Sequence, residues 1–150
     1  MISIDVKKGK GVRRLEDVGK YTRHAIRKTW FDLGKNLKSS AIKEIISGTK
    51  TGRVYVIRGP SGKVRRHVSS APGETHADMS GDLRLSLDYK VSGGGEKMVF
   101  GYLNDPPIYA RVIEKGSDKI KARPTLKNAW KDQSHQVERH FMVEMTRVFD

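Results

Sequence analysis

The 150-residue chain contains no cysteine, which excludes disulfide bridges and thiolate metal sites. It is also poor in aromatic residues, at 7%, and only 36% of it is apolar. No apolar run approaches the roughly 18 residues that a membrane-spanning helix requires, so no membrane partner is expected. The first residues lack the apolar centre of a secretory signal. These absences are compatible with a protein that is made in a reducing cytosol.

Acidic side chains are scarce beside basic ones. Lysine and arginine number 30 against 17 aspartate and glutamate, giving a net charge of +13, and residues 1–50 hold 13 basic and 5 acidic side chains. Such an excess attracts a phosphate backbone or an acidic protein face, although surplus lysine also keeps a small domain soluble. The sequence has no helix-turn-helix, zinc finger or stacking aromatic pair. Any contact with nucleic acid would therefore be electrostatic and independent of base sequence.

The N-terminal third predicts a long amphipathic helix. Apolar residues from Leu15 to Ile46 recur at steps of three and four, and the opposite face is cationic. Gly34 weakens this helix a little. Before it, residues 2–6 alternate like a strand, so residues 1–14 are interpreted as an N-terminal strand and basic arm.

The middle of the chain predicts antiparallel strands. Two β-rich runs at 53–58 and 63–68 flank a Gly-Pro turn and indicate a hairpin. Residues 69–81 show no period and are predicted to form a long exposed loop, which in a small domain is usually functional or mobile. Two further strands are expected at 85–91 and 98–102.

A helical pattern returns at the end. Residues 109–114 fit either a short strand or a helical turn, and from Pro124 to Val148 the apolar spacing predicts a closing helix. The whole is a single α+β domain over 1–150, in which the long N-terminal helix packs on a small antiparallel sheet with a long hairpin and loop.

Catalytic and metal-binding patterns are not convincing. Ser61 and Ser80 lack a strand-to-helix elbow and a placed base. His135 and His140 are five residues apart and would point about 140° apart on a helix, so they do not form a metal pair. We expect no enzymatic activity, cofactor or metal, and the acidic cluster of the loop (Glu74, Asp78 and Asp82) is better explained as caps or contacts to a basic neighbour.

Two stretches of the chain, in this order, resemble known sequence patterns. The first stretch resembles the pattern "SAPGEPP…TGRLRxSI" and consists of Ser70-Ala71-Pro72-Gly73-Glu74 followed by Ser80-Gly81-Asp82-Leu83-Arg84-Leu85-Ser86-Leu87. The second resembles the pattern "YAxxxExGT…ARPFLRPA" and consists of Tyr109-Ala110, Ile113-Glu114-Lys115-Gly116-Ser117 and Ala122-Arg123-Pro124-Thr125-Leu126. Both patterns are typical of the tail-component or neck proteins of long-tailed phages, which include relatives of the lambda minor tail protein Z. Thr75-His76 replaces the usual paired prolines, Asp82 stands where arginine is frequent, and Thr125 replaces an aromatic residue.

The resemblance implies a structural virion protein of the head–tail junction, encoded by a phage or prophage and assembled in the bacterial cytoplasm. Its implied partners are further copies of itself in a ring, commonly of six, a head-closure or connector protein, a tail terminator or tail tube protein, and DNA that passes through the lumen. By position, the implied interface residues are Ser70, Ala71, Pro72, Gly73, Glu74, Ser80, Gly81, Asp82, Glu114, Gly116, Arg123 and Pro124.

A basic surface would suit a ring around DNA. We expect Lys28, Lys35, Arg65 and Arg66 to meet DNA or an acidic neighbouring ring. Two alternatives stay open from the residues: a sequence-nonspecific nucleic-acid-binding protein that acts as a monomer or dimer, and a small hydrolase that uses Asp78, Asp82 and a histidine.

Overall fold

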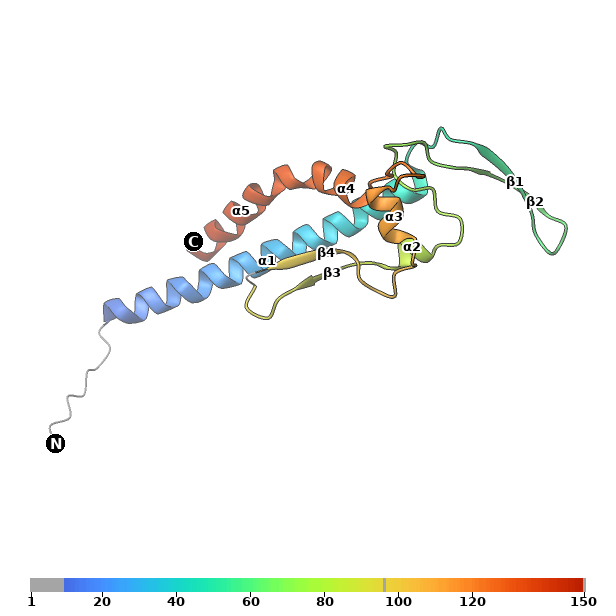
Figure 1. Cartoon of the computed structure of the whole chain (residues 1–150). Coiled ribbons are helices and arrows are strands. Elements are labelled where there is room, and N and C mark those ends of the chain that lie inside the picture. The colour runs from blue at the N-terminus through green and yellow to red at the C-terminus, as the bar shows by residue number, and fades with distance from the viewer. Residues whose placement is uncertain (1–9, 96, 150) are drawn as a thin grey trace.

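The computed structural model describes the backbone of residues 10–95 and 97–149 and the side chains of residues 18–95 and 97–147 (Figure 1). The helices are α1 (Lys10–Ser47), α2 (Asp82–Leu85), α3 (Ala110–Lys115), α4 (Thr125–Gln133), the short 3-10 helix η1 (Ser134–Gln136) and α5 (Val137–Phe149). The strands are β1 (Val54–Arg58), β2 (Val64–Val68), β3 (Leu87–Val91) and β4 (Met98–Tyr102). The α+β class predicted from the sequence is confirmed. The predicted strand at 2–6 lies outside the described residues.

Helix α1 is the scaffold of the molecule. Its 38 residues run along most of the molecule, with α4 and α5 on one side and β3–β4 on the other (Figure 1). One stripe of α1 is buried, and it forms a cluster with residues of β3 and α4: Leu33, Leu37, Ala41, Ile45, Leu87 and Ala129. The spacing of four residues in this stripe is the helical periodicity that the sequence predicted. The helix begins at Lys10, so the predicted basic arm over 1–14 is wrong for residues 10–14.

The strands form two separate two-stranded sheets. β3 pairs with β4 and lies on α1, whereas β1 pairs with β2 in a hairpin that projects from the end of the body (Figure 1). The predicted hairpin is thus confirmed, and only one of the two sheets contributes to the core. Among the described residues, no helix is both long enough and apolar enough to cross a bilayer.

Three element boundaries differ from the predictions. Residues 82–85 form α2, so the strand predicted over 85–91 begins at Leu87. The segment 109–114, left open between strand and helix, is helical in α3. The predicted closing C-terminal helix is confirmed, but the 3-10 turn η1 divides it into α4 and α5. This turn lets both helices follow and contact α1.

Gly34 has a packing role, and replacing it should destabilise the protein. Gly34 is buried, and a Cβ at this position would overlap the ring of Tyr89. Gly34→Ala gains helix propensity but overpacks the site, so we expect a net loss of about 1 kcal/mol in the free energy of unfolding. Gly19→Ala is the matched control: no atom lies within 4 Å of a Cβ there, so it should stabilise by up to about 1 kcal/mol. Urea denaturation of both variants measures the difference, and equal shifts would contradict the packing role.

Candidate interaction surface

The two motif stretches fold against each other at the end of the molecule that carries the hairpin. The Gly73 N–H donates to the carbonyl of Ala122 at 3.0 Å, and the Arg123 Nε donates to the carbonyl of Ser70 at 3.0 Å. Asn128, in α4, places its side-chain amide 3.4 Å from the Thr75 hydroxyl. Residues that are about 50 positions apart in the sequence therefore form one structural unit.

Glu114 is the centre of the second stretch. Its carboxylate accepts hydrogen bonds from the backbone N–H groups of Leu126, at 3.0 Å, and of Lys127, at 3.2 Å. It also accepts the Tyr102 hydroxyl at 3.3 Å, and burial of that hydroxyl raises the Tyr102 pKa far above its usual value. The first N–H groups of a helix have no partner within the helix, so Glu114 caps α4 from another helix.

Gly116 and Arg123 close the turn between α3 and α4. Gly116 has φ +79°, and a Cβ there would lie 2.9 Å from the Ala122 nitrogen, so glycine suits this position. Its N–H donates to the Val112 carbonyl at 2.8 Å and ends α3. After the turn, the backbone N–H of Arg123 donates a hydrogen bond to the Ile113 carbonyl at 2.7 Å. These residues, predicted to contact a partner, make contacts within their own chain.

The loop at 69–81 is not exposed throughout, which corrects the prediction. Glu74 fastens it to the connection after α1, because its carboxylate accepts the Thr51 hydroxyl at 2.6 Å and the Ala71 N–H at 2.7 Å. Chiefly the Thr51 hydrogen bond holds the Glu74 pKa below its usual value. The buried positions of the loop are Ser70, Thr75, Ala77 and Gly81.

The predicted interface residues therefore fall into three groups. Ser70 and Gly81 are buried within the chain, so they offer little surface to a partner in this conformation. Six are half-buried: Ala71, Glu74, Glu114, Gly116, Arg123 and Pro124. Four are exposed: Pro72, Gly73, Ser80 and Asp82.

The acidic side chains of the loop bond locally. The Ser80 hydroxyl donates to Asp82 at 2.7 Å, and Asp78 accepts the Gly81 N–H at 2.8 Å and lies 3.5 Å from the Arg84 guanidinium. Among the described side chains, those of residues 18–95 and 97–147, no group of three or more histidine, aspartate or glutamate residues could hold a metal ion. Asp78 and Asp82 thus have local hydrogen-bonding roles beside α2.

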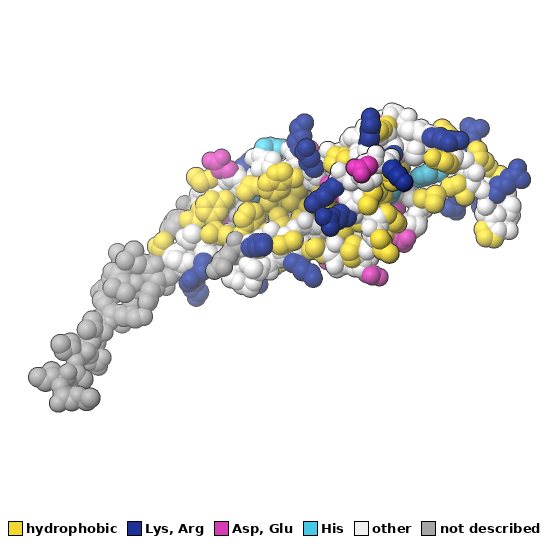
Figure 2. Space-filling view, in the orientation of Figure 1, with side chains coloured by type: hydrophobic (Ala, Val, Ile, Leu, Met, Phe, Trp, Pro, Cys, Tyr) yellow, Lys and Arg dark blue, Asp and Glu magenta, His cyan; other side chains and the backbone are white. Residues whose placement is uncertain are grey.

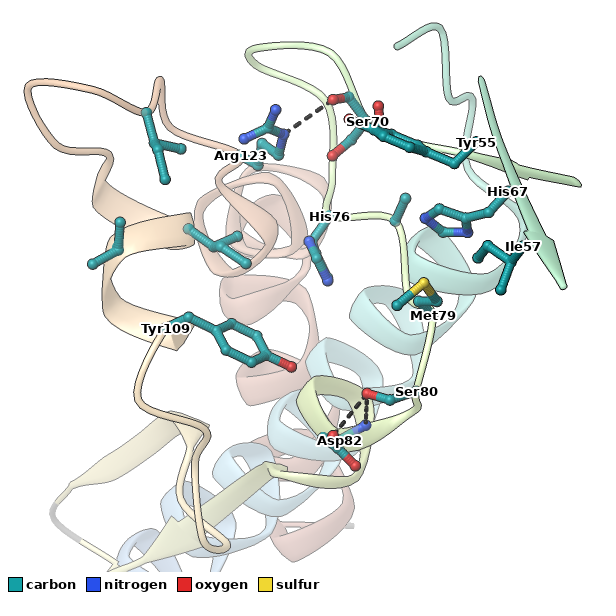
Figure 3. Close-up of a pocket in the computed structure, with 15 residues that line it drawn as sticks. Tyr55, Ile57, His67, Ser70, His76, Met79, Ser80, Asp82, Tyr109 and Arg123 are labelled. Carbon is teal, nitrogen blue, oxygen red and sulfur yellow. Dashed lines mark hydrogen bonds between the residues drawn. The ribbon is translucent and has the colours of Figure 1, made fainter. Parts of the chain in front are cut away.

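A groove of about 760 Å³ lies between the hairpin, the loop and α3. Most of its lining is apolar, and Figure 3 shows Tyr55, Ile57 and His67 reaching it from the hairpin and Tyr109 from the start of α3. His76 lies within it, and burial lowers its pKa, which favours the neutral imidazole. The sequence reasoning missed this groove, although the alternation of Tyr55 and Ile57 marked one face of β1.

The predicted cationic residues differ in their surroundings. Lys28 donates to Glu144 at 2.7 Å, and Glu144 also accepts Arg147 at 2.7 Å. The Lys28 hydrogen bond is the largest cause of the lowered Glu144 pKa. Lys28 is thus half-buried and paired within the chain, whereas Lys35, Arg65 and Arg66 are exposed, and the contact of all four with a partner stays a prediction.

The fold and this surface define a basic α+β domain with a projecting hairpin, and within 10–95 and 97–149 no metal-binding cluster accompanies it. Comparisons with family models, curated proteins and solved structures find no match to this chain.

Proposed function

We propose that this chain is a structural virion protein of the head–tail connector of a long-tailed phage or prophage. It would form a neck or tail-completion ring that joins head-closure and tail-terminating proteins around the DNA channel. The observation that carries the proposal is the pair of motif stretches, which occur in the order typical of that family and which fold into one unit through Ser70, Gly73, Ala122 and Arg123.

The hairpin supports an assembling role. A two-stranded hairpin by itself is at best marginally stable in water, and neither strand of this one packs closely on another of the described helices and strands. Its valines are exposed, as are large apolar side chains elsewhere in the chain. Contiguous exposed apolar surface usually marks an interaction site. A protein whose role is to hold neighbours would bury this surface on assembly.

The charge suits a DNA conduit. Lys35 on α1 and Arg65 and Arg66 on β2 are exposed, and Figure 2 shows lysine and arginine side chains along the visible face, over the body and at the hairpin. Contact with phosphates needs no base recognition, so DNA could pass without being held at a sequence.

Deletion of the gene in the phage or lysogen that encodes it tests the proposal. We expect induced cultures to release DNA-filled heads and separate tails, which electron microscopy of negatively stained lysates distinguishes from complete virions. Supplying the wild-type chain from a plasmid should restore joined particles. Complete, infectious virions without the gene would contradict the proposal.

Sequence-nonspecific nucleic-acid binding is the second candidate, and the exposed Arg65 and Arg66 favour it. Under this alternative, the isolated monomer retards duplex DNA in a gel, and affinity falls steeply with salt. A connector component should instead bind free DNA weakly and act only within the particle. Retardation by a monomer at physiological salt, together with unaffected virions in the deletion strain, would establish the alternative.

A further inference from the structure

The outer face of the hairpin combines apolar and cationic side chains. The register pairs Val54 with Val68, Val56 with Arg66 and Arg58 with Val64, and paired residues point to the same face. The valines at 54, 56, 64 and 68 are 54%, 63%, 55% and 37% exposed. Tyr55, Ile57 and His67 belong to the opposite face, which lines the groove. Within the part of the chain that the structure describes, no element covers the outer face.

A hollow of about 660 Å³ on the same chain has matching chemistry. It lies where α2, the turn after β4 and the start of α3 meet. Asp82 and Asp105 line it together with Leu85 and Ile108, which are 71% and 100% exposed, and its lining contains no lysine or arginine. It offers carboxylates and apolar contacts side by side.

A second hollow with exposed apolar side chains fits the hairpin less well. Beside β4 and α4, a hollow of about 360 Å³ is lined by Met98, Phe100, Trp130 and Lys127, and it has no carboxylate. Two cationic surfaces repel each other and lose solvation on contact, so Arg58 and Arg66 would oppose docking there. In the acidic hollow, the same arginines meet opposite charges.

We propose that the outer face of the hairpin of one copy docks in the Asp82–Ile108 hollow of a second copy. The valines would pack on Leu85 and Ile108, while Arg58 and Arg66 would meet Asp82 and Asp105. The two surfaces are unlike, so the contact is head-to-tail: the copy that docks its hairpin keeps a free hollow, and the copy that receives it keeps a free hairpin for a further copy. This inference rests on the proposed function only in that a closed ring requires such a pair of surfaces.

DNA is a poorer occupant of this face. Phosphates would pair with Arg58 and Arg66 but leave the four valines in water, so apolar burial would contribute nothing. A second copy satisfies both kinds of side chain. Arg65, on the opposite face of β2, would stay outside the contact.

The natural absence of cysteine allows a direct test. One preparation carries Val56→Cys and a second carries Ile108→Cys, and both positions are exposed, so folding should be unaffected. After equimolar mixing and mild oxidation, we expect a mixed disulfide dimer on non-reducing gels. Its yield should be on the order of ten times that of the matched pair Arg65→Cys with Ile108→Cys, because docking raises the effective thiol concentration.

Two further arms keep the inference falsifiable. Adding Arg58→Glu and Arg66→Glu to the Val56→Cys chain should lower the yield to that of the control pair. Equal yields from the Val56→Cys and Arg65→Cys mixtures would overturn the inference. So would a Val56→Cys chain that dimerises mainly with itself, since that indicates hairpin-to-hairpin contact. If the mixed dimer forms but the deletion strain makes intact virions, the interface is supported and the connector role is contradicted. If the deletion strain releases separate heads and tails but no mixed dimer forms, the connector role is supported and the interface is contradicted.

Discussion

Leu87→Ala is expected to lower the free energy of unfolding by about 2–5 kcal/mol, whereas Leu85→Ala should change it by about 0.5 kcal/mol or less. Leu87 is fully buried at the start of β3 and belongs to the core cluster with Leu33 and Leu37 of α1. Truncation removes buried apolar contacts and leaves a cavity against a scaffold helix that cannot move inward freely. Leu85 is 71% exposed and loses little on truncation.

Urea denaturation followed by circular dichroism measures both variants. The comparison is well matched, because the same residue type is shortened in the same way two positions apart. Comparable losses for the two variants would contradict the structure and would favour the strand that the sequence predicted. In a strand starting at residue 85, positions 85 and 87 share one face, so both leucines would be buried together.

Glu114→Ala should be the second most damaging change, with an expected loss of about 2 kcal/mol. The carboxylate is half-buried and accepts the N–H groups of Leu126 and Lys127 and the Tyr102 hydroxyl. Removing it leaves the first N–H groups of α4 and a buried hydroxyl without their partner, and hydrogen bonds to charged groups contribute about 1.5–3 kcal/mol each. Glu114→Gln keeps an acceptor oxygen and should lose less.

Asp118→Ala supplies the control for Glu114. Asp118 is an exposed acid in the same connection between α3 and α4, so its loss should fall within about 0.5 kcal/mol. Hydrogen exchange of the α4 amides gives a local readout, and we expect faster exchange at Leu126 and Lys127 in Glu114→Ala alone. If the Glu114 and Asp118 variants were equally stable, Glu114 would have no capping role.

The sequence was sufficient where periodicity and turn chemistry act locally. The four-residue spacing from Leu33 to Ile45 predicted α1, and the Gly-Pro turn between two β-rich runs predicted the hairpin. The sequence did not predict contacts between residues that lie far apart in the chain. Periodicity alone cannot pair Lys28 with Glu144, which lies 116 residues further along the chain and neutralises a cation that was predicted to meet DNA or an acidic neighbour.

The motif stretches show the same limit at the candidate site. Their residue types indicated turns and helix starts, and both occur: Gly116 ends α3 and Glu114 caps α4. What the sequence could not show is that these residues face one another. The hydrogen bond from Arg123 to Ser70 spans 53 positions and depends on how the loop packs beside α3. Several residues predicted to meet a neighbour, Glu74, Glu114 and Arg123 among them, also make hydrogen bonds inside the fold.

Because the hairpin projects from the body, the residues needed for folding and the residues proposed for binding lie in different parts of the chain. Core positions such as Leu33 and Leu87, and turn positions such as Gly116, cannot change without a loss of folding, so they tolerate little variation. The outer positions of β1 and β2 are exposed, and neither strand packs closely on another of the described helices and strands, so substitutions there should leave the scaffold intact. The face that would determine binding specificity can therefore vary in sequence while the body stays the same. Two such proteins could then share a fold and still not assemble with each other.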